Sequence, residues 1–472
     1  MTEYLLYSKR CWIDDQIIEA TIHIKDGLIV EIYKGQKIDR LSDTIDVKDK
    51  TSSSMSPARD VEESEIYFYD NNNLIIMPGI IDVHVHINEP GRTDWEGFET
   101  ATKAAALGGV TTLVEMPLNT SPVTTNVEAF EIKKKAARNK LHVNCGFYGG
   151  VIPGNTDAIE ALIKAGVFGI KGFLIHSGID EFPHSNKQQL EEICPILAKY
   201  DVPLLLHCEL ETDEELPPIS DPKSYQDYLH SRPPSWEINA IELAISLQNK
   251  YKCKVHIVHL STAEALDIIH QQKLKSKGLT VETCAHYLYF NAEQIPDASP
   301  LYKCAPPIRD KANNQKLWQA VKDGQIDFLA SDHSPAPPEI KLLNEGNLSK
   351  AWGGIAGLQF TLAALWAANE ILTLEEFIPL LTAQPAKFIG LDQSKGSIKK
   401  GYHADLTVWD DEEYFTVTQE MVAHRHKESP YVGEKLKGKV VHCMVDGKFV
   451  VQNAKLDQLN AGKLLLKKYE ND

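Results

Sequence analysis

Two histidines spaced two residues apart are the first candidates for chemistry in this chain. His84 and His86 lie in IIDVHVHINEP, whose apolar residues predict a buried strand. Residues i and i+2 of a strand point to the same side, so both imidazoles would face one cation. The alternative is a chance pair of strand histidines, and the place of the strand in the fold has to decide between the two.

Lys171 is a second candidate, in the apolar segment VFGIKGFLIHSG. Burial of a free ammonium is costly, lowers the pKa of the amine and favours its neutral form. A neutral amine can react with carbon dioxide, and the resulting carbamate could bridge two metal ions as a carboxylate does. Taken alone, Lys171 is better interpreted as a lysine that reaches water from a strand end. Only the other candidate ligands reverse that interpretation.

Three further ligand-type residues lie where apolar segments end. His207 belongs to VPLLLHCE, His259 to KVHIVHLST and Asp332 to IDFLASDHSP. His256 shares a face with His259, and we choose His259 because it is nearer the C-terminal end of the strand. Asp332 could bind a metal, accept a proton from water and return it to a leaving group. Capping of a following helix is its structural alternative.

These residues need a scaffold that brings strand ends together. Eight apolar segments alternate with amphipathic segments between residues 74 and 334. Continuous apolar strands require covering helices, so the pattern predicts an α/β fold with a closed (β/α)8 TIM-like barrel. Barrel enzymes build their sites at the C-terminal ends of the strands, where the candidate residues lie. The barrel therefore favours metal binding.

Strand-like segments flank the predicted barrel. We expect an N-terminal β segment over residues 1–76, the barrel over 77–395, and a C-terminal β segment and tail over 396–472. A small β-sandwich-like domain built from both chain ends would explain why strand patterns occur on either side. The polar stretch at about 43–65 is predicted to be a flexible exposed insertion, because its Ser, Asp and Glu residues bury little apolar surface.

Composition limits the class of protein. Of 472 residues, 43% are apolar and 24% are charged, as in globular proteins. The net charge of −17 argues against a nucleic-acid partner. The N-terminus has no secretion signal pattern and no apolar stretch is long enough for a membrane span, so we expect a cytoplasmic protein. The eight cysteines contain no C-x-x-C pair, which argues against a disulfide framework or a thiolate zinc cage.

The order H-x-H, Lys, His, His, Asp along a barrel resembles the amidohydrolase superfamily with a binuclear metal site. Within its cyclic-amidase branch the chain is most similar to the allantoinases. The longest block that carries the resemblance is DVHVHINEPGRTDWEGFETATKAAALGGVTTLVEMPLN. The others are GIKGFLIHSGIDEFPH, LLLHCE, IVHLST, ETCAHYLYF, KCAPPIRD and FLASDHSP. Together they span nearly the whole predicted barrel, from about residue 77 to 390.

The resemblance implies a cofactor, a reaction and a substrate. Two divalent metal ions, expected to be zinc, would be bound by His84, His86, carboxylated Lys171, His207, His259 and Asp332. Asn119, Cys304 and Ser334 would surround the substrate ring, and Asp332 would be the catalytic acid and base. The expected reaction is hydrolysis of the cyclic amide of allantoin to allantoate, in purine catabolism. The resemblance also implies a homo-oligomer, in particular a tetramer.

One departure from a neighbouring family bears on the substrate. Dihydroorotases place an arginine at the position of Asn88 to hold the substrate carboxylate, whereas this chain reads NEPG. An uncharged hydantoin such as allantoin needs no such counter-ion. Hydantoinase, dihydropyrimidinase and dihydroorotase activities stay open as alternatives, as does a non-catalytic scaffold. We also expect an ion pair between Arg92 and Glu96, and positions beside the ligands for His286 and His333.

Overall fold

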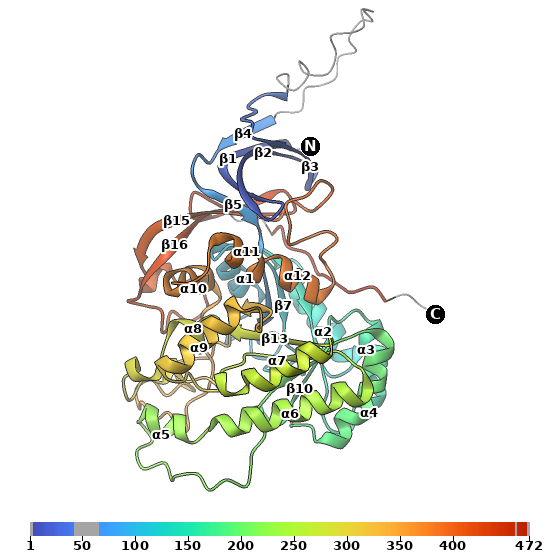
Figure 1. Cartoon of the computed structure of the whole chain (residues 1–472), viewed down its shortest axis with the longest axis vertical. Coiled ribbons are helices and arrows are strands. Elements are labelled where there is room, and N and C mark those ends of the chain that lie inside the picture. The colour runs from blue at the N-terminus through green and yellow to red at the C-terminus, as the bar shows by residue number, and fades with distance from the viewer. Residues whose placement is uncertain (1–2, 42–65, 458–459, 470–472) are drawn as a thin grey trace, which may run out of the picture.

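The core of the molecule is a closed barrel of parallel strands (Figure 1). The computed structural model describes residues 3–41, 66–457 and 460–469. The barrel strands are, in order, β6 (Ile80–Val85), β7 (Val110–Glu115), β8 (Asn144–Phe147) with β9 (Gly149–Gly150), β10 (Ile170–Phe173), β11 (Leu204–His207), β12 (Val255–Ile257), β13 (Leu279–Cys284) and β14 (Phe328–Ala330). Only Tyr148 separates β8 from β9, so these are two halves of one strand.

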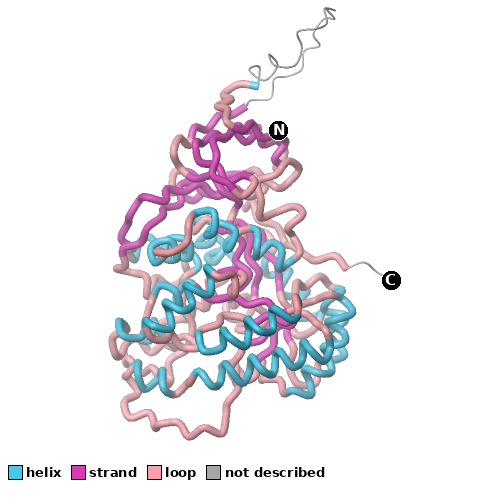
Figure 2. The backbone as a smooth tube through the Cα atoms, viewed as in Figure 1, coloured by secondary structure: helices cyan, strands magenta, loops and turns pink. Residues whose placement is uncertain are grey.

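The ring closes between the last strand and the first. The backbone N–H of His86 donates to the carbonyl of His333 at 2.7 Å, and Val85 forms a parallel bridge with the same residue. All residues of β6, β7, β10 and β11 are buried, as expected for parallel strands that helices cover. In Figure 2 the strands lie inside a layer of helices. The predicted (β/α)8 barrel is confirmed.

The covering helices follow the apolar periodicity of their sequences. They are α1 (Phe98–Leu107), α2 (Val127–Ala137), α3 (Thr156–Lys164), α4 (Lys187–Tyr200), α5 (Tyr225–His230), α6 (Pro234–Tyr251), α7 (Leu266–Lys275), α8 (Ala285–Tyr289), α9 (Lys311–Lys322), α10 (Thr361–Ala368), α11 (Leu374–Leu381) and α12 (Ala383–Ile389). In α4 a capping box of Asn186 and Gln189 begins the helix. Leu190, Ile193 and Leu197 then bury one face. None of the described helices is long and apolar enough to cross a lipid bilayer.

A second sheet joins the two ends of the chain. It contains nine strands: β1 (Glu3–Ile13), β2 (Gln16–Lys25), β3 (Leu28–Lys34), β4 (Ile66–Asp70), β5 (Ile75–Pro78), β15 (Leu406–Thr416), β16 (Lys435–Val445), β17 (Lys448–Gln452) and β18 (Lys455–Leu456). β5 pairs with β1 on one side and with β15 on the other. Ile22, Ile76 and Met444 share one apolar core. The predicted β unit built from both chain ends is therefore confirmed, while the polar stretch at about 43–65 lies outside the described residues.

Gly79 is the link between the two sheets. β5 belongs to the terminal sheet and β6 to the barrel, and Gly79 is the one residue between these two strands. A Cβ atom at Gly79 would lie 2.2 Å from both Cγ2 and Oγ1 of Thr111, a buried residue of β7. The chain can change sheets here only because position 79 has no side chain.

Gly79→Ala is expected to destabilise the fold by about 1–3 kcal/mol, because the added methyl group overpacks the site against Thr111. The free energy of unfolding in denaturant measures the effect. Gly353→Ala is the matched control, since a Cβ there would meet its nearest atoms at 3.9 Å, an ordinary contact. Equal stability of the two variants would contradict the close-approach explanation.

Candidate metal centre and active site

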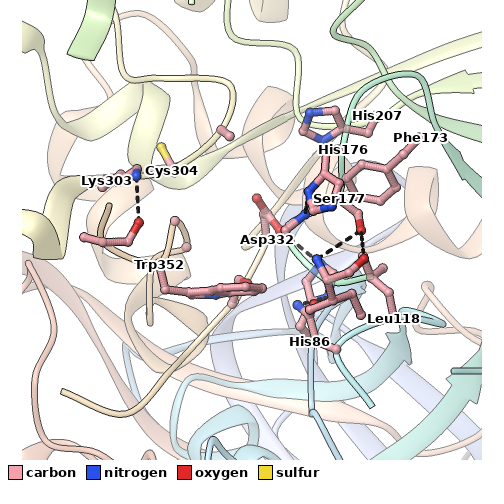
Figure 3. A pocket seen from close by; sticks show the side chains of 18 of the residues that line it. His86, Leu118, Phe173, His176, Ser177, His207, Lys303, Cys304, Asp332 and Trp352 are labelled. Carbon is pink, nitrogen blue, oxygen red and sulfur yellow. Dashed lines mark hydrogen bonds and ion pairs between the residues drawn. The ribbon is translucent and has the colours of Figure 1, made fainter. Parts of the chain in front are cut away.

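A cavity of about 640 Å³ opens at the C-terminal ends of the barrel strands. Every residue that the sequence singled out as a ligand or a substrate contact lines it: His84, His86, Asn119, Lys171, His207, His259, Cys304, Asp332 and Ser334. In Figure 3 the Lys303–Cys304 segment and Trp352 lie across the cavity from His207 and Phe173. The fold thus brings residues from seven of the eight barrel positions and their following loops to one surface.

Asp332 faces the histidine pair of β6. Its Oδ1 atom lies 3.2 Å from Nε2 of His84 and 3.6 Å from Nε2 of His86. The ligand atoms of the three residues all lie within 4.8 Å of one another, a spacing at which they could hold one divalent metal ion. Burial raises the pKa of the Asp332 carboxyl, and the charges of His84 and Lys171 oppose that effect.

Glu282 in β13 orients His84 and was not identified from the sequence. One carboxylate oxygen contacts Nδ1 of His84, and the other lies 3.1 Å from Nε2 of His256. Burial acts to raise the pKa of Glu282, but the contacts with these histidines outweigh it and lower the pKa. A carboxylate at Nδ1 fixes the ring and leaves Nε2 of His84 toward Asp332 and the cavity. The available signal was a charged residue inside the apolar strand LTVETC.

Glu282→Gln is expected to weaken metal binding by about 10- to 100-fold, because a neutral amide holds the His84 ring less firmly and makes its Nε2 less basic. Competition with a chelator during metal analysis measures the affinity. Glu237→Gln is the control, since Glu237 is an equally buried carboxylate that pairs with Arg309 and does not line the cavity. If both variants retain metal equally well, Glu282 has no part in holding the metal.

Lys171 has the environment of a neutral amine. It is 1% exposed, and its Nζ atom has no hydrogen-bond partner among the described residues. Nζ lies 5.1 Å from the ring centre of Phe173. Burial lowers the pKa of Lys171 to about 8, against the opposing charge of Asp332. An unpartnered buried amine with a lowered pKa fits the carbamate predicted for this position.

The rings of His207 and His259 have their centres 4.6 Å apart, and the ring centres of His259 and His84 are 5.4 Å apart. Nε2 of His207 contacts Oε2 of Glu209 at 2.7 Å, which leaves its Nδ1 for a ligand. Nδ1 of His259 is buried without a partner among the described residues. By contrast, Nδ1 of His256 contacts the Thr280 hydroxyl at 2.8 Å, and His256 does not line the cavity.

Strained backbone accompanies the candidate residues at the rim. Asn119, His259 and Asp332 have φ angles of 61°, 40° and 45°, in the left-handed region that non-glycine residues rarely adopt. Each follows the end of a barrel strand, where the strain directs a side chain into the cavity. Nδ2 of Asn119 lies 3.4 Å from Nδ1 of His86, and its buried Oδ1 has no partner among the described atoms.

Two polar residues near the rim, Asn88 and Arg92, have partners that the sequence did not indicate, and the expected ion pair of Arg92 needs correction. Asn88 does not line the cavity: it is fully buried, and its Nδ2 donates to the carbonyl of Pro335 at 3.1 Å. That this position needs no charged side chain for an uncharged substrate stays a prediction. Arg92 pairs with Glu181 at 2.7 Å rather than with Glu96, because the loop after β10 reaches the cavity mouth. Oε2 of Glu96 instead lies 3.5 Å from Nε2 of His333, and both side chains are buried.

Apart from Cys304, the cavity wall opposite the histidines includes residues that the sequence did not single out, among them Trp352 and Lys303. Trp352 meets Trp95 edge-on with ring centres 4.8 Å apart. Lys303 donates to the carbonyls of Ser349 and Ala351 at 3.2 and 2.6 Å, which ties the loop after β13 to the loop after β14. These contacts join loops far apart in the sequence, so no local pattern could reveal them.

Comparison with known proteins agrees with this geometry. Residues 75–450 match the model of the amidohydrolase family. The chain is 42% identical to the allantoinase of Arabidopsis thaliana over 98% of this chain and 91% of that protein, and 41% identical to the allantoinase of Saccharomyces cerevisiae over 84% and 88%. The solved L-hydantoinase (dihydropyrimidinase) of Arthrobacter aurescens is 29% identical, with a TM-score of 0.86 over 98% of this chain and 99% of that chain. The chain is a member of the amidohydrolase family, within which it belongs with the allantoinases.

Proposed function

We propose that this enzyme hydrolyses the cyclic amide bond of allantoin to give allantoate, in purine catabolism. Two divalent metal ions, most simply zinc, are assigned to the ligands His84, His86, Lys171, His207, His259 and Asp332. Lys171, as its carbamate, would supply carboxylate-type oxygens as ligands to the metal ions. The observation that carries the proposal is that all six side chains line one cavity in a chain 42% identical to an allantoinase.

The residues present fit such a metal pair. Four imidazoles, a carboxylate and a buried lysine with no hydrogen-bond partner among the described residues make a donor set suited to zinc. Glu282 and Glu209 contact the ring nitrogens of His84 and His207 and orient them. When bound, the metals would acidify a water molecule and polarise the ring carbonyl.

The protein side chains supply the proton transfers and the orientation. Asp332 accepts the proton of the attacking water and returns it to the ring nitrogen that leaves, so it acts first as base and then as acid. Its raised pKa, caused by burial, makes it a better proton acceptor than a solvent-exposed aspartate. Asn119, Cys304 and Ser334 line the cavity beside it and are assigned to hold the substrate ring.

Hydantoinase activity is the second candidate, because the L-hydantoinase of Arthrobacter aurescens shares the fold at a TM-score of 0.86. Substrate choice depends on the loops over the cavity, and the shared barrel does not determine it. The 42% identity to an allantoinase, against 29% to this hydantoinase, favours allantoin.

Purified protein supplied with zinc and bicarbonate is expected to open the allantoin ring with a kcat/KM on the order of 100-fold above that for hydantoin, dihydrouracil or dihydroorotate. The physical reason is that polar groups shaped for one ring stay unpaired with another. Ring opening is followed by absorbance and product analysis for the four compounds side by side. A higher kcat/KM for another of the four compounds would refute the assignment of allantoin as the substrate. It would leave the proposed hydrolytic mechanism in place for that compound.

A further inference from the structure

Two buried ligand-type side chains lie behind Asp332 and have no part in the proposed mechanism. Cys284 is the last residue of β13, and His286 lies in the short helix α8 that follows it. They are 0% and 1% exposed, and neither lines the cavity. The ligand atoms of Cys284, His286 and Asp332 nevertheless all lie within 4.8 Å of one another.

The imidazole of His286 has no hydrogen-bond partner among the described residues, as expected of a metal ligand in the absence of its metal ion. Both of its ring nitrogens are buried and make no hydrogen bond to any described residue; the Ser331 backbone lies close, but outside hydrogen-bonding geometry. Buried polar atoms are nearly always satisfied in folded proteins, so two unsatisfied nitrogens on one ring need an explanation. Two ring nitrogens without a hydrogen-bond partner leave the imidazole able to offer a nitrogen to a metal ion.

The three donors form a recognised type of zinc set. A thiolate, an imidazole and a carboxylate together suit a borderline-soft divalent cation. Bond lengths of about 2.0–2.3 Å would require the donor atoms, which lie within 4.8 Å of one another, to move closer together around the ion. Binding converts the Cys284 thiol to a thiolate and releases its proton to solvent.

We propose that Cys284, His286 and Asp332 form an accessory site for zinc or another thiophilic divalent cation, separate from the catalytic ligand set except for the shared Asp332. Occupation of this site draws the Asp332 carboxylate away from His84 and His86. Excess zinc therefore inhibits the enzyme. The binding itself does not depend on the proposed function; only the inhibition does.

Cobalt titration of the purified protein tests the binding. After the catalytic set has been filled, further Co²⁺ is expected to produce the charge-transfer absorption of a cobalt–thiolate bond, because Cys284 is the only sulfur in the accessory set. Cys284→Ser is expected to abolish this band, and His286→Gln to weaken the binding that produces it. Cys443→Ser is the matched control, since Cys443 is an equally buried thiol in the terminal sheet and should leave the band unchanged.

A second variant separates this site from the thiol that lines the cavity. If Cys304→Ser, rather than Cys284→Ser, removes the band, or if no thiolate band develops, the accessory site is refuted. Turnover assays with increasing zinc then test inhibition, which Cys284→Ser should relieve. Loss of the band in Cys284→Ser supports the site even if allantoin proves not to be the substrate. Unchanged zinc inhibition in a Cys284→Ser protein that lacks the band would refute the competition for Asp332.

Discussion

Lys171→Ala is expected to abolish metal binding and ring opening together, with kcat/KM falling on the order of 10³-fold or more, because several kcal/mol of transition-state stabilisation depend on the metals. Lys171 is the only amine among the six candidate ligands. Its Nζ atom has no hydrogen-bond partner among the described residues. Metal analysis and steady-state kinetics on the same preparation measure both losses.

A small carboxylic acid provides the specific test of the carbamate. Acetate or propionate can place a carboxylate in the space that Lys171→Ala opens, so it should restore part of the metal content and activity. Lys303→Met is the matched control: Lys303 lines the same cavity, and burial lowers its pKa to about 8 also, but its Nζ atom donates hydrogen bonds to backbone carbonyls. That variant should retain its metals. Full activity of Lys171→Ala without added acid would exclude the carbamate.

Asp332→Asn is expected to reduce kcat by about 10²- to 10⁴-fold, the usual contribution of a positioned acid and base. An amide oxygen can still face the His84 and His86 nitrogens, which lie 3.2 and 3.6 Å from the native carboxylate, but it cannot carry the proton. Metal content should therefore fall less than kcat. Kinetics together with metal analysis separate these two effects.

Asp82→Asn is the control for Asp332. Asp82 is also a buried carboxylate in this region and accepts hydrogen bonds from the backbone of His84 and Ser331, but it does not line the cavity. Its loss of kcat should be much smaller. If Asp332→Asn retains more than a tenth of the wild-type kcat, another group must transfer the proton.

The barrel and the candidate ligands were predictable because their signals are local. An apolar segment that ends in histidine, lysine or aspartate can be recognised within ten residues, and a barrel brings all such ends to one face. This is why the nine predicted site residues, drawn from strands and loops between residues 84 and 334, all line the same cavity. Their roles as ligands and substrate contacts stay predictions for the variants above to test.

Contacts between distant segments could not be predicted in the same way. Glu282 holds His84 across 198 positions of sequence, and the partner of Arg92 proved to be Glu181 rather than the nearer Glu96. The amide of Asn88 donates to the backbone carbonyl of Pro335, in the loop after β14, and no local pattern indicates that contact. None of these side-chain contacts produces a periodic pattern of residues from which it could be predicted.

The sequence by itself determined the barrel, the strand patterns that flank it and the types of residue at each strand end. Those features depend on hydrophobic periodicity, which each segment carries on its own. Only the tertiary structure decided that the two chain ends meet in one sheet, that the chain passes from this sheet to the barrel at Gly79, and that Glu282 contacts His84. Side-chain direction and close approach are determined by neighbours remote in sequence, and those neighbours are brought together only when the chain has folded.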